Sequence, residues 1–346
     1  MIYLGAKRTN IDSIAGIWKT ELHDFLFKKR EKERNKCKGL DGSKVDTYFK
    51  KMESDVDFYL ANKGIDATDK TWISAELQYF KVNFEIIILA DKNGLEKEKN
   101  LFVARAKGAS DKAKACYQLL MEKLYEAFTQ QSSGGGKTRS HQFFNRMKIT
   151  TCPYCNMQYT FTLDCDKGKT APEYDHFHDK SDYPVLAVSF YNLVPSCHVC
   201  NHIKGIKKTV TVNPYFAGFE SRFVFVDDKD ASKVLTKAEV MKRGGGRMLL
   251  RKIDGKESND DKGNIETFAL NELYAMHDKY ISEIVEKVPM YDDIYSDLAT
   301  TFQTKAKTAQ EVYDFVWGKH LTEAEYEDRP LSKLTKDILD QLEIKR

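Results

Sequence analysis

Two pairs of cysteines constrain this chain more than any other feature of its sequence. They are Cys152 with Cys155 and Cys197 with Cys200, each with two residues between the thiols. This spacing lets one tight turn present both sulfurs to a single tetrahedral ion, and two such turns complete a four-sulfur zinc site. A closed site leaves no open coordination position, so we expect a structural zinc and not a catalytic one. The alternative, four unrelated buried cysteines, requires two correctly spaced pairs to coincide in one short region.

The remaining cysteines and the first residues bear on the compartment of the chain. Cys37, Cys116 and Cys165 have no partner at this spacing and are predicted to be ordinary thiols. The first ten residues lack the apolar segment of a secretory signal, and no apolar run reaches the roughly 18 residues that a membrane helix needs. The sequence therefore predicts a cytoplasmic protein without a disulfide framework and without a membrane partner.

The charge of the chain says little as a total. Fifty-five basic residues stand against 52 acidic ones, a net charge of +3, so any surface for nucleic acid must come from local clustering. Residues 28–34 mix both signs and favour a solvated helix surface. The basic, glycine-rich stretch at 242–252 either holds phosphates, through Arg243 and Arg247, or is a solvated loop.

The length of 346 residues fits two to three domains. Near the N-terminus, apolar residues recur at three- and four-residue intervals, which is typical of one face of an amphipathic helix. They are Ile14, Trp18, Leu22, Phe25 and Leu26. We expect a mainly helical fold with a small α+β core. The predicted parts are a mainly helical domain at 1–130, a linker at 131–150, the core at 151–216 and a mainly helical domain at 217–346.

Other elements follow from the same patterns. A helix is expected over 111–129, with Ala115, Leu119, Leu120, Leu124 and Phe128 facing inward. Residues 77–89 are either a strand or a buried helix. A strand is expected over 222–226, and a helix over 271–288 that Pro289 should end.

Residues 134–138 read Gly-Gly-Gly-Lys-Thr and invite comparison with a phosphate-binding P-loop. That pattern requires a glycine five residues before Gly136, where this chain has Gln131, and it requires a preceding hydrophobic strand. The sequence therefore argues against an ATPase, and residues 130–139 are predicted to be a flexible joint.

The 41 residues between the two cysteine pairs carry the remaining motifs. They contain Glu-Tyr-Asp-His-Phe at 173–177 and Asn-Leu at 192–193, and Asn-His-Ile-Lys-Gly follows the second pair at 201–205. Over about residues 150–216 this arrangement resembles the HNH endonuclease superfamily, and most nearly the HNH proteins of bacterial antiphage systems, the Septu-type and retron-associated nucleases. The flanks resemble them only weakly, at 271–274 and 329–333.

The resemblance implies a role for each motif residue. Asp175 is expected to bind a divalent cation, Mg²⁺ or Mn²⁺, and His176 to act as the general base, since the ordinary pKa of histidine lies close to neutral pH. Asn192 is expected to orient the His176 ring by a hydrogen bond. Asn201 is expected to be the second metal ligand, with His202 as the alternative, because neighbours on a helix point about 100° apart and only one can face the metal.

The resemblance also implies a fold and contacts to substrate. The expected core is the ββα-metal (His-Me finger) core of HNH proteins, stapled by the four-cysteine zinc site and flanked by helical regions. Its strands are expected at 159–163, 172–177 and 193–194, with a helix from about Cys197. Lys204 and Lys207 are expected to contact the phosphate backbone. Of the other histidines, His178 follows the motif where the family tends to have proline, His198 is expected to be exposed, and His277 is expected to pack.

The function that follows is a metal-dependent endonuclease that cuts DNA, with antiphage defence as its role. By the same resemblance, the added domains are expected to mediate self-association or docking to a separate ATPase. Two alternatives stay open: an RNase built on the same core, and a zinc-stapled nucleic-acid-binding module without catalysis. The motif encodes neither the preferred sugar nor the sequence specificity, the partner, the oligomeric state or the trigger for activity.

Overall fold

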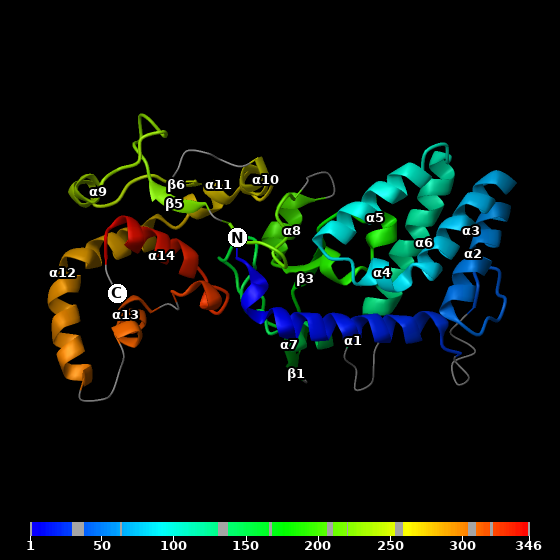
Figure 1. Ribbon diagram of the computed structural model, residues 1–346, viewed down its shortest axis with the longest axis horizontal. Helices are drawn as coiled ribbons and strands as arrows, with labels where there is room; N and C mark the ends of the chain where they lie inside the picture. Colours follow the sequence, from blue (N-terminus) through cyan, green and yellow to red (C-terminus); the bar gives the residue numbers. More distant parts are fainter. Residues whose placement is uncertain are drawn as a thin grey trace. The chain divides into compact units, whose positions relative to one another are not determined.

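A computed structural model of the chain describes residues 2–29, 38–62, 64–130, 138–165, 168–205, 210–219, 221–252, 259–303, 309–318 and 321–344. The chain divides into two compact units (Figure 1). The helical unit comprises residues 7–148 and 162–195, and the cysteine unit comprises residues 1–6, 149–161 and 196–346. None of the helices in the described ranges is long and apolar enough to cross a membrane.

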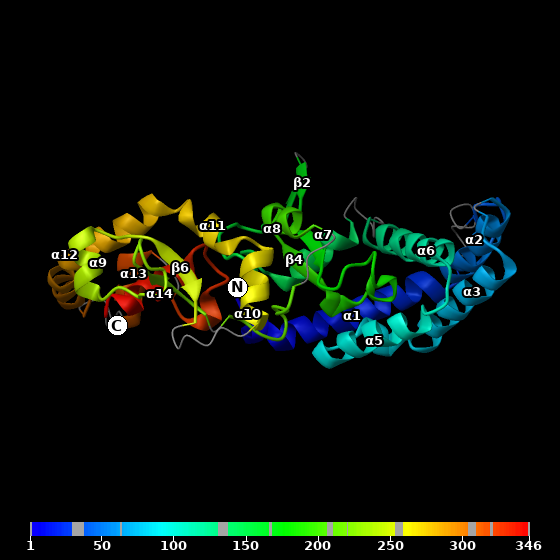
Figure 2. The same cartoon turned by 90° about the horizontal axis from the view of Figure 1, so that it is seen from above.

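Seven helices build most of the helical unit, and α2, α3 and α6 pack against one another (Figures 1 and 2). They are α1 (Arg8–Phe27), α2 (Tyr48–Asn62), α3 (Ala67–Val82), α4 (Phe84–Ile88), α5 (Lys92–Arg105), α6 (Asp111–Gln130) and α7 (Arg139–Met147). The predicted first helix is confirmed as α1, and all five of its spaced apolar residues are buried. Residues 77–89 are helical apart from short joints, in α3 and α4, which settles the alternative that the sequence left open.

Helix α6 occupies the predicted range, but its buried stripe is displaced in the first half. Leu120, Leu124 and Phe128 are buried as expected, whereas Ala115 is exposed and the neighbouring Cys116 is buried. The predicted linker is also partly structured, because α7 lies within it and buries Phe143, Phe144 and Met147. Residues 131–137 of that linker lie outside the described ranges.

The core of the helical unit is built around Trp18 of α1. Its indole ring meets Phe128 and Phe143 edge-on, with ring centroids 4.9 and 4.7 Å apart. Such aromatic pairs add about 0.5–1.5 kcal/mol beyond the area they bury. The indole N–H donates to the carbonyl of Val188 at 3.0 Å, so the same residue ties α1 to the segment between the later strands.

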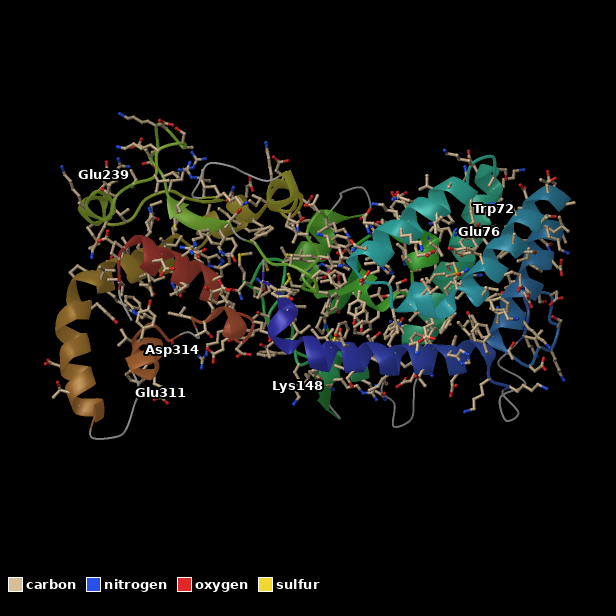
Figure 3. The ribbon with its side chains drawn as sticks, in the orientation of Figure 1. Trp72, Glu76, Lys148, Glu239, Glu311 and Asp314 are labelled. Atoms are coloured by element: carbon tan, nitrogen blue, oxygen red, sulfur yellow. The ribbon has the colours of Figure 1, made fainter. Side chains whose placement is uncertain are left out.

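A partly buried ion pair joins α3 to α5 in the same unit. Arg105 donates to both carboxylate oxygens of Glu76, at 2.8 and 3.1 Å, and the indole N–H of Trp72 donates to the Arg105 carbonyl at 3.0 Å. Figure 3 labels Trp72 and Glu76 on α3. At its start, α3 has a reciprocal cap in which Asp66 accepts from the Asp69 backbone and Asp69 from the Asp66 backbone, which satisfies two otherwise unpaired N–H groups.

Short strands carry the motif residues. Strands β1 (Leu163–Cys165) and β2 (Gly168–Thr170) form an antiparallel pair, and β3 (Glu173–His176) pairs with β4 (Leu193–Ser196). Between β3 and β4 lie two 3-10 turns, η2 (Pro184–Leu186) and η3 (Phe190–Asn192). Strands therefore occur near 172–177 and 193–194, as predicted. The strand predicted at 159–163 is wrong: Tyr159 makes only an isolated bridge to Thr151, because the chain there folds back around the first cysteine pair.

The cysteine unit combines one strand pair with helices and turns. They are η1 (Leu4–Lys7), α8 (His198–Lys204), β5 (Arg222–Phe225), α9 (Lys237–Arg243), β6 (Met248–Arg251), α10 (Asn259–Thr267), α11 (Leu270–Ala275), α12 (Asp278–Gln303), α13 (Ala309–Trp317), η4 (Glu323–Glu325) and α14 (Ser332–Gln341). Strands β5 and β6 are antiparallel, with Phe223 opposite Leu250. Helix α14 packs on β5 and α11 on β6, so the predicted strand at 222–226 is confirmed as β5 within the core of this unit.

Pro289 does not end a helix, contrary to the sequence prediction. Helix α12 runs through it to Gln303, and Figure 1 shows the helix changing direction along its length, as expected where proline removes a hydrogen bond. Two residues further on, Tyr291 is buried and stacks on Trp317 of α13, with centroids 5.5 Å apart. The apolar contact with α13 thus continues past the proline and stabilises the second half of the helix.

The predicted core at 151–216 is split between the two compact units. Residues 151–161 and 196–216 belong to the cysteine unit, and residues 162–195 to the helical unit. The reason is that each cysteine turn packs with the other turn, whereas the segment between β3 and β4 packs on α1, α4, α5 and α6. The predicted domain bounds therefore differ from the compact units of the structure.

Candidate functional site

The four cysteines of the two pairs converge, as their spacing predicts. Their sulfur atoms lie within 4.8 Å of one another, and those of Cys155 and Cys197 are 3.9 Å apart. All four side chains are buried. A zinc ion bound to four thiolates at about 2.3 Å requires sulfur atoms about 3.8 Å apart. The cluster therefore fits a tetrahedral metal ion such as zinc.

The surroundings of the cluster favour metal-bound thiolates. Backbone N–H groups of Met157 and Cys200 donate to the sulfurs of Cys155 and Cys197, each at 3.4 Å. Hydrogen bonds from Cys152 first, and then from Cys155 and Cys200, hold the pKa of Cys197 well below its usual range. Burial raises the pKa of Cys152. Four adjacent buried thiols do not all ionise alone, and a bound cation such as zinc would stabilise them as thiolates.

Residues far along the chain hold the first cysteine turn in place. The phenol of Tyr274 donates a hydrogen bond to the carbonyl of Cys155. The buried Asn156 forms hydrogen bonds with residues that follow η4. Its side chain donates to the Tyr326 carbonyl at 2.8 Å and accepts from the Lys333 N–H at 3.1 Å, while its own carbonyl accepts from the Leu331 N–H at 2.5 Å. The weakly matching flanks at 271–274 and 329–333 thus both contact the cysteine turn.

Sequence reasoning missed Asn156. Its φ of 53° places it in the left-handed region, which asparagine tolerates better than most residues. An asparagine directly after a cysteine turn was therefore a readable signal for that turn, but its partners were not readable.

The predicted catalytic residues lie on β3 of the helical unit. Asp175 is 3% exposed, and His176 is half-buried. The Nε2 atom of His176 lies 3.0 Å from the carbonyl oxygen of Ala187. The His176 ring forms a T-shaped contact with the ring of Tyr125, at a centroid distance of 4.8 Å. A carbonyl can only accept, so a neutral His176 carries its proton on Nε2 and keeps the lone pair on Nδ1. In this form Nδ1 is the ring nitrogen that can take a proton.

Asn192 is buried and holds the loop, in a different way from the one predicted. Its side-chain oxygen accepts from the N–H of His178 at 2.8 Å, and its NH₂ group donates to the carbonyls of His178 and Leu186 at 3.0 and 3.1 Å. The expected hydrogen bond to the His176 ring is replaced by the Ala187 carbonyl. The difference has a simple cause: His178 and Leu186 are buried and present backbone groups that one amide side chain can bond together.

His178, which the sequence singled out only weakly, is buried. Its Nε2 atom lies 3.1 Å from a carboxylate oxygen of Glu96 on α5, and its ring meets those of Phe177 and Tyr183 edge-on. Together with Asn192, this contact attaches the loop after β3 to the helices of its unit.

The remaining motif residues lie on α8 of the cysteine unit. Asn201 is half-buried, and His202 is exposed with its ring beside that of His198, at a centroid distance of 5.7 Å. The assignment of Asn201 as second metal ligand, with His202 as the alternative, stays a prediction. Lys204 is 2% exposed, so its burial does not favour the predicted phosphate contact. Lys207 lies outside the described residues.

The two predicted arginines near the glycine run differ in their surroundings. Arg243 donates to the carboxylate of Asp227 at 2.8 Å. Arg247 is exposed at the edge of a cavity of about 550 Å³ between β6, α11 and α12. The cavity is also lined by Asn271, Glu272, Asp278 and Ser282. Arg247 is therefore the better placed of the two to meet a ligand.

Comparison with known proteins finds one partial relative. Part of the chain is 34% identical to a Septu protein, PtuB, of Bacillus thuringiensis, over 96 residues that make up 27% of this chain and 35% of that protein. The match thus spans about a third of the relative's length. No family model matches the chain, and no solved structure matches it.

Proposed function

We propose that this chain is a metal-dependent HNH-type endonuclease that hydrolyses DNA, as the nuclease component of a bacterial antiphage defence system. The observation that carries the chemistry is the contact between His176 Nε2 and the Ala187 carbonyl at 3.0 Å. It favours the tautomer in which Nδ1 can accept a proton. The partial likeness to a Septu protein supports the defence role.

In the proposed mechanism His176 takes a proton at Nδ1 from the attacking water. The protonated ring is stabilised by the Nε2–H bond to Ala187, which strengthens as the ring gains charge. Buried Asp175 is the proposed carboxylate ligand on the neighbouring position of β3, and Asn201 the proposed second ligand. A divalent cation, Mg²⁺ or Mn²⁺, would relieve charge on the scissile phosphate and stabilise the leaving oxygen.

The four cysteines are proposed to hold a structural zinc. Four sulfur ligands close the coordination sphere, so its role is to fix the cysteine turns and the start of α8. A separate ATPase, and self-association, are the partners that the family resemblance implies.

The test is cleavage of supercoiled plasmid with Mg²⁺ or Mn²⁺ by the native chain, by His176→Ala and by the matched control His23→Ala. His23 is an exposed histidine of α1. Loss of a general base lowers rates by roughly 10²–10⁴-fold, so we expect His176→Ala to lose nicking and His23→Ala to retain it. EDTA should abolish nicking, and zinc content and circular dichroism should be unchanged in both variants.

Equal nicking by the native chain and His176→Ala would sink the catalytic assignment. Plasmid binding without cleavage in all three proteins, with or without an ATPase subunit, would favour the zinc-stapled binding module. Competition between DNA and RNA of one sequence separates the DNase from the RNase.

A further inference from the structure

Helix α6 presents two neighbouring side chains to the loop that begins at His176. Tyr125 contacts the His176 ring at a centroid distance of 4.8 Å and an interplanar angle of 67°. Glu122 pairs with the ammonium of Lys180 at 2.7 Å, and that ammonium also lies 5.2 Å from the centre of the Tyr125 ring. Residues three apart share one face of a helix. The loop therefore contacts this face of α6 through two of its side chains, Glu122 and Tyr125.

The contact with Tyr125 limits how the imidazole can turn. A ring held by one hydrogen bond can rotate about its side-chain bonds and exchange the positions of its two nitrogens. An aromatic ring packed against it at 67° blocks that rotation sterically. The ring of Tyr125 and the carbonyl of Ala187 thus both restrict the imidazole to one orientation.

Tyr125 is unsuited to proton transfer itself. Burial first, and then the carboxylates of Glu126, Glu173 and Asp175, raise the pKa of its phenol well above the ordinary value. The phenol stays protonated at neutral pH, which leaves the ring to act through its shape.

We propose that Tyr125 is a positioning residue for His176: its ring holds the imidazole with Nε2 at the Ala187 carbonyl, so that Nδ1 is the nitrogen of the proposed base. The catalytic part of this inference rests on the proposed function, whereas the ring orientation does not. Tyr125 lies outside the region that resembles HNH proteins, so the residue motif alone gave no reason to single it out.

The test compares Tyr125→Phe with Tyr125→Leu in the full chain. Phenylalanine keeps the aromatic ring and removes only the hydroxyl, whereas leucine stays apolar but removes the ring. The first readout is the tautomer of His176, from ¹⁵N chemical shifts of the ring at a pH of about 8, where histidine is neutral. We expect Tyr125→Phe to keep the Nε2–H form and Tyr125→Leu to gain a several-fold larger share of the Nδ1–H form.

The second readout is plasmid nicking. Misplacing a catalytic group slightly lowers the rate by roughly ten- to a hundred-fold, so kcat should fall by that factor in Tyr125→Leu, with KM little changed, and Tyr125→Phe should restore it. Far-UV circular dichroism and thermal unfolding establish that both variants fold.

The two readouts test the positioning role of Tyr125 and the proposed nuclease activity separately. An unchanged tautomer in folded Tyr125→Leu would overturn the positioning role, even if nicking fell, because the effect would then come from elsewhere. A shifted tautomer in a chain that never nicks DNA would support the positioning role and contradict the proposed nuclease.

Discussion

A single buried amide holds the loop between β3 and β4. Asn192 is fully buried and satisfies an N–H and two carbonyls of that loop through its side chain. Backbone groups left unpaired in the interior are costly. The residue therefore stabilises the loop that carries both His178 and the Ala187 carbonyl.

Replacing Asn192 tests this role. We expect Asn192→Ala to lower the free energy of unfolding by about 2–4 kcal/mol, because it removes three hydrogen bonds to buried backbone groups. Asn192→Asp keeps an acceptor for the His178 N–H but loses the donor and buries a charge, so it should be destabilising as well. Urea unfolding measures both. A loss below about 0.5 kcal/mol in Asn192→Ala would contradict the account.

The Arg243–Asp227 contact gives a prediction of pH dependence. The Arg243 guanidinium first, and then the Lys229 backbone N–H, lower the pKa of Asp227 to about 2. Because the folded pKa lies below the ordinary value of about 3.9, the stabilisation is present above pH 4 and is lost as the pH falls through 2. Carboxyl NMR titration should show this pKa, and Arg243→Gln should return it towards 3.9. An unchanged pKa in that variant would refute the pairing.

At the scale of elements, α14 attaches to β5 through a buried ion pair. Lys333 donates to Asp337 at 2.6 Å and to the Ser221 carbonyl at 2.9 Å, and Asp337 accepts from the Phe223 N–H at 3.0 Å. Both charged side chains are about 5% exposed. The pair thus links the helix, the strand and the chain before the strand.

Removing one partner of this pair should be severe. Lys333→Met leaves the Asp337 carboxylate buried without a cation, and we expect a loss of about 3–5 kcal/mol in the free energy of unfolding. Lys336→Met is the matched control on the same helix, since its pair with Asp340 is partly exposed and should contribute about 1 kcal/mol or less. Equal losses in the two variants, measured by denaturant unfolding, would contradict the prediction.

Elements with a local pattern could be predicted, and those set by distant contacts could not. The helix α1 follows from apolar spacing, and the cysteine cluster from two residues between thiols, since both patterns are complete within a short stretch. The continuation of α12 through Pro289 depends on Tyr291 meeting Trp317 of another helix. The roles of Asn156 and Tyr125 depend on partners from distant segments, and the burial of Lys204 on packing that its motif does not encode.

For the whole molecule, the cysteine cluster belongs to one unit and Cys116 to the other. Structural zinc sites contribute on the order of 10 kcal/mol to folding. Removing the proposed zinc ion with a chelator should therefore unfold the cysteine unit and expose its four thiols. Cys116 is buried on α6, and burial raises its pKa to about 11, so it should stay unreactive at pH 8.

Alkylation with iodoacetamide, read peptide by peptide by mass spectrometry, measures this difference. With zinc bound, all five of these cysteines should be protected, and after chelation only the four of the cluster should react. Alkylation of Cys116 at the same rate as the other four would mean that the two units lose their structure together.

The hydrogen bonds of Asn156 to residues late in the chain also bear on the order in which the first cysteine turn is assembled during synthesis. Both cysteine pairs have left the ribosome once residue 200 has emerged, whereas Tyr326 and Lys333, which bond Asn156, emerge 126 and 133 residues after residue 200. At about 5–20 residues per second this interval lasts roughly 6–27 s. In a nascent chain the four thiols can thus meet, and the proposed zinc ion can bind, well before later residues anchor the first cysteine turn; a chain that stalls in that interval would present the assembled thiols on an unanchored turn.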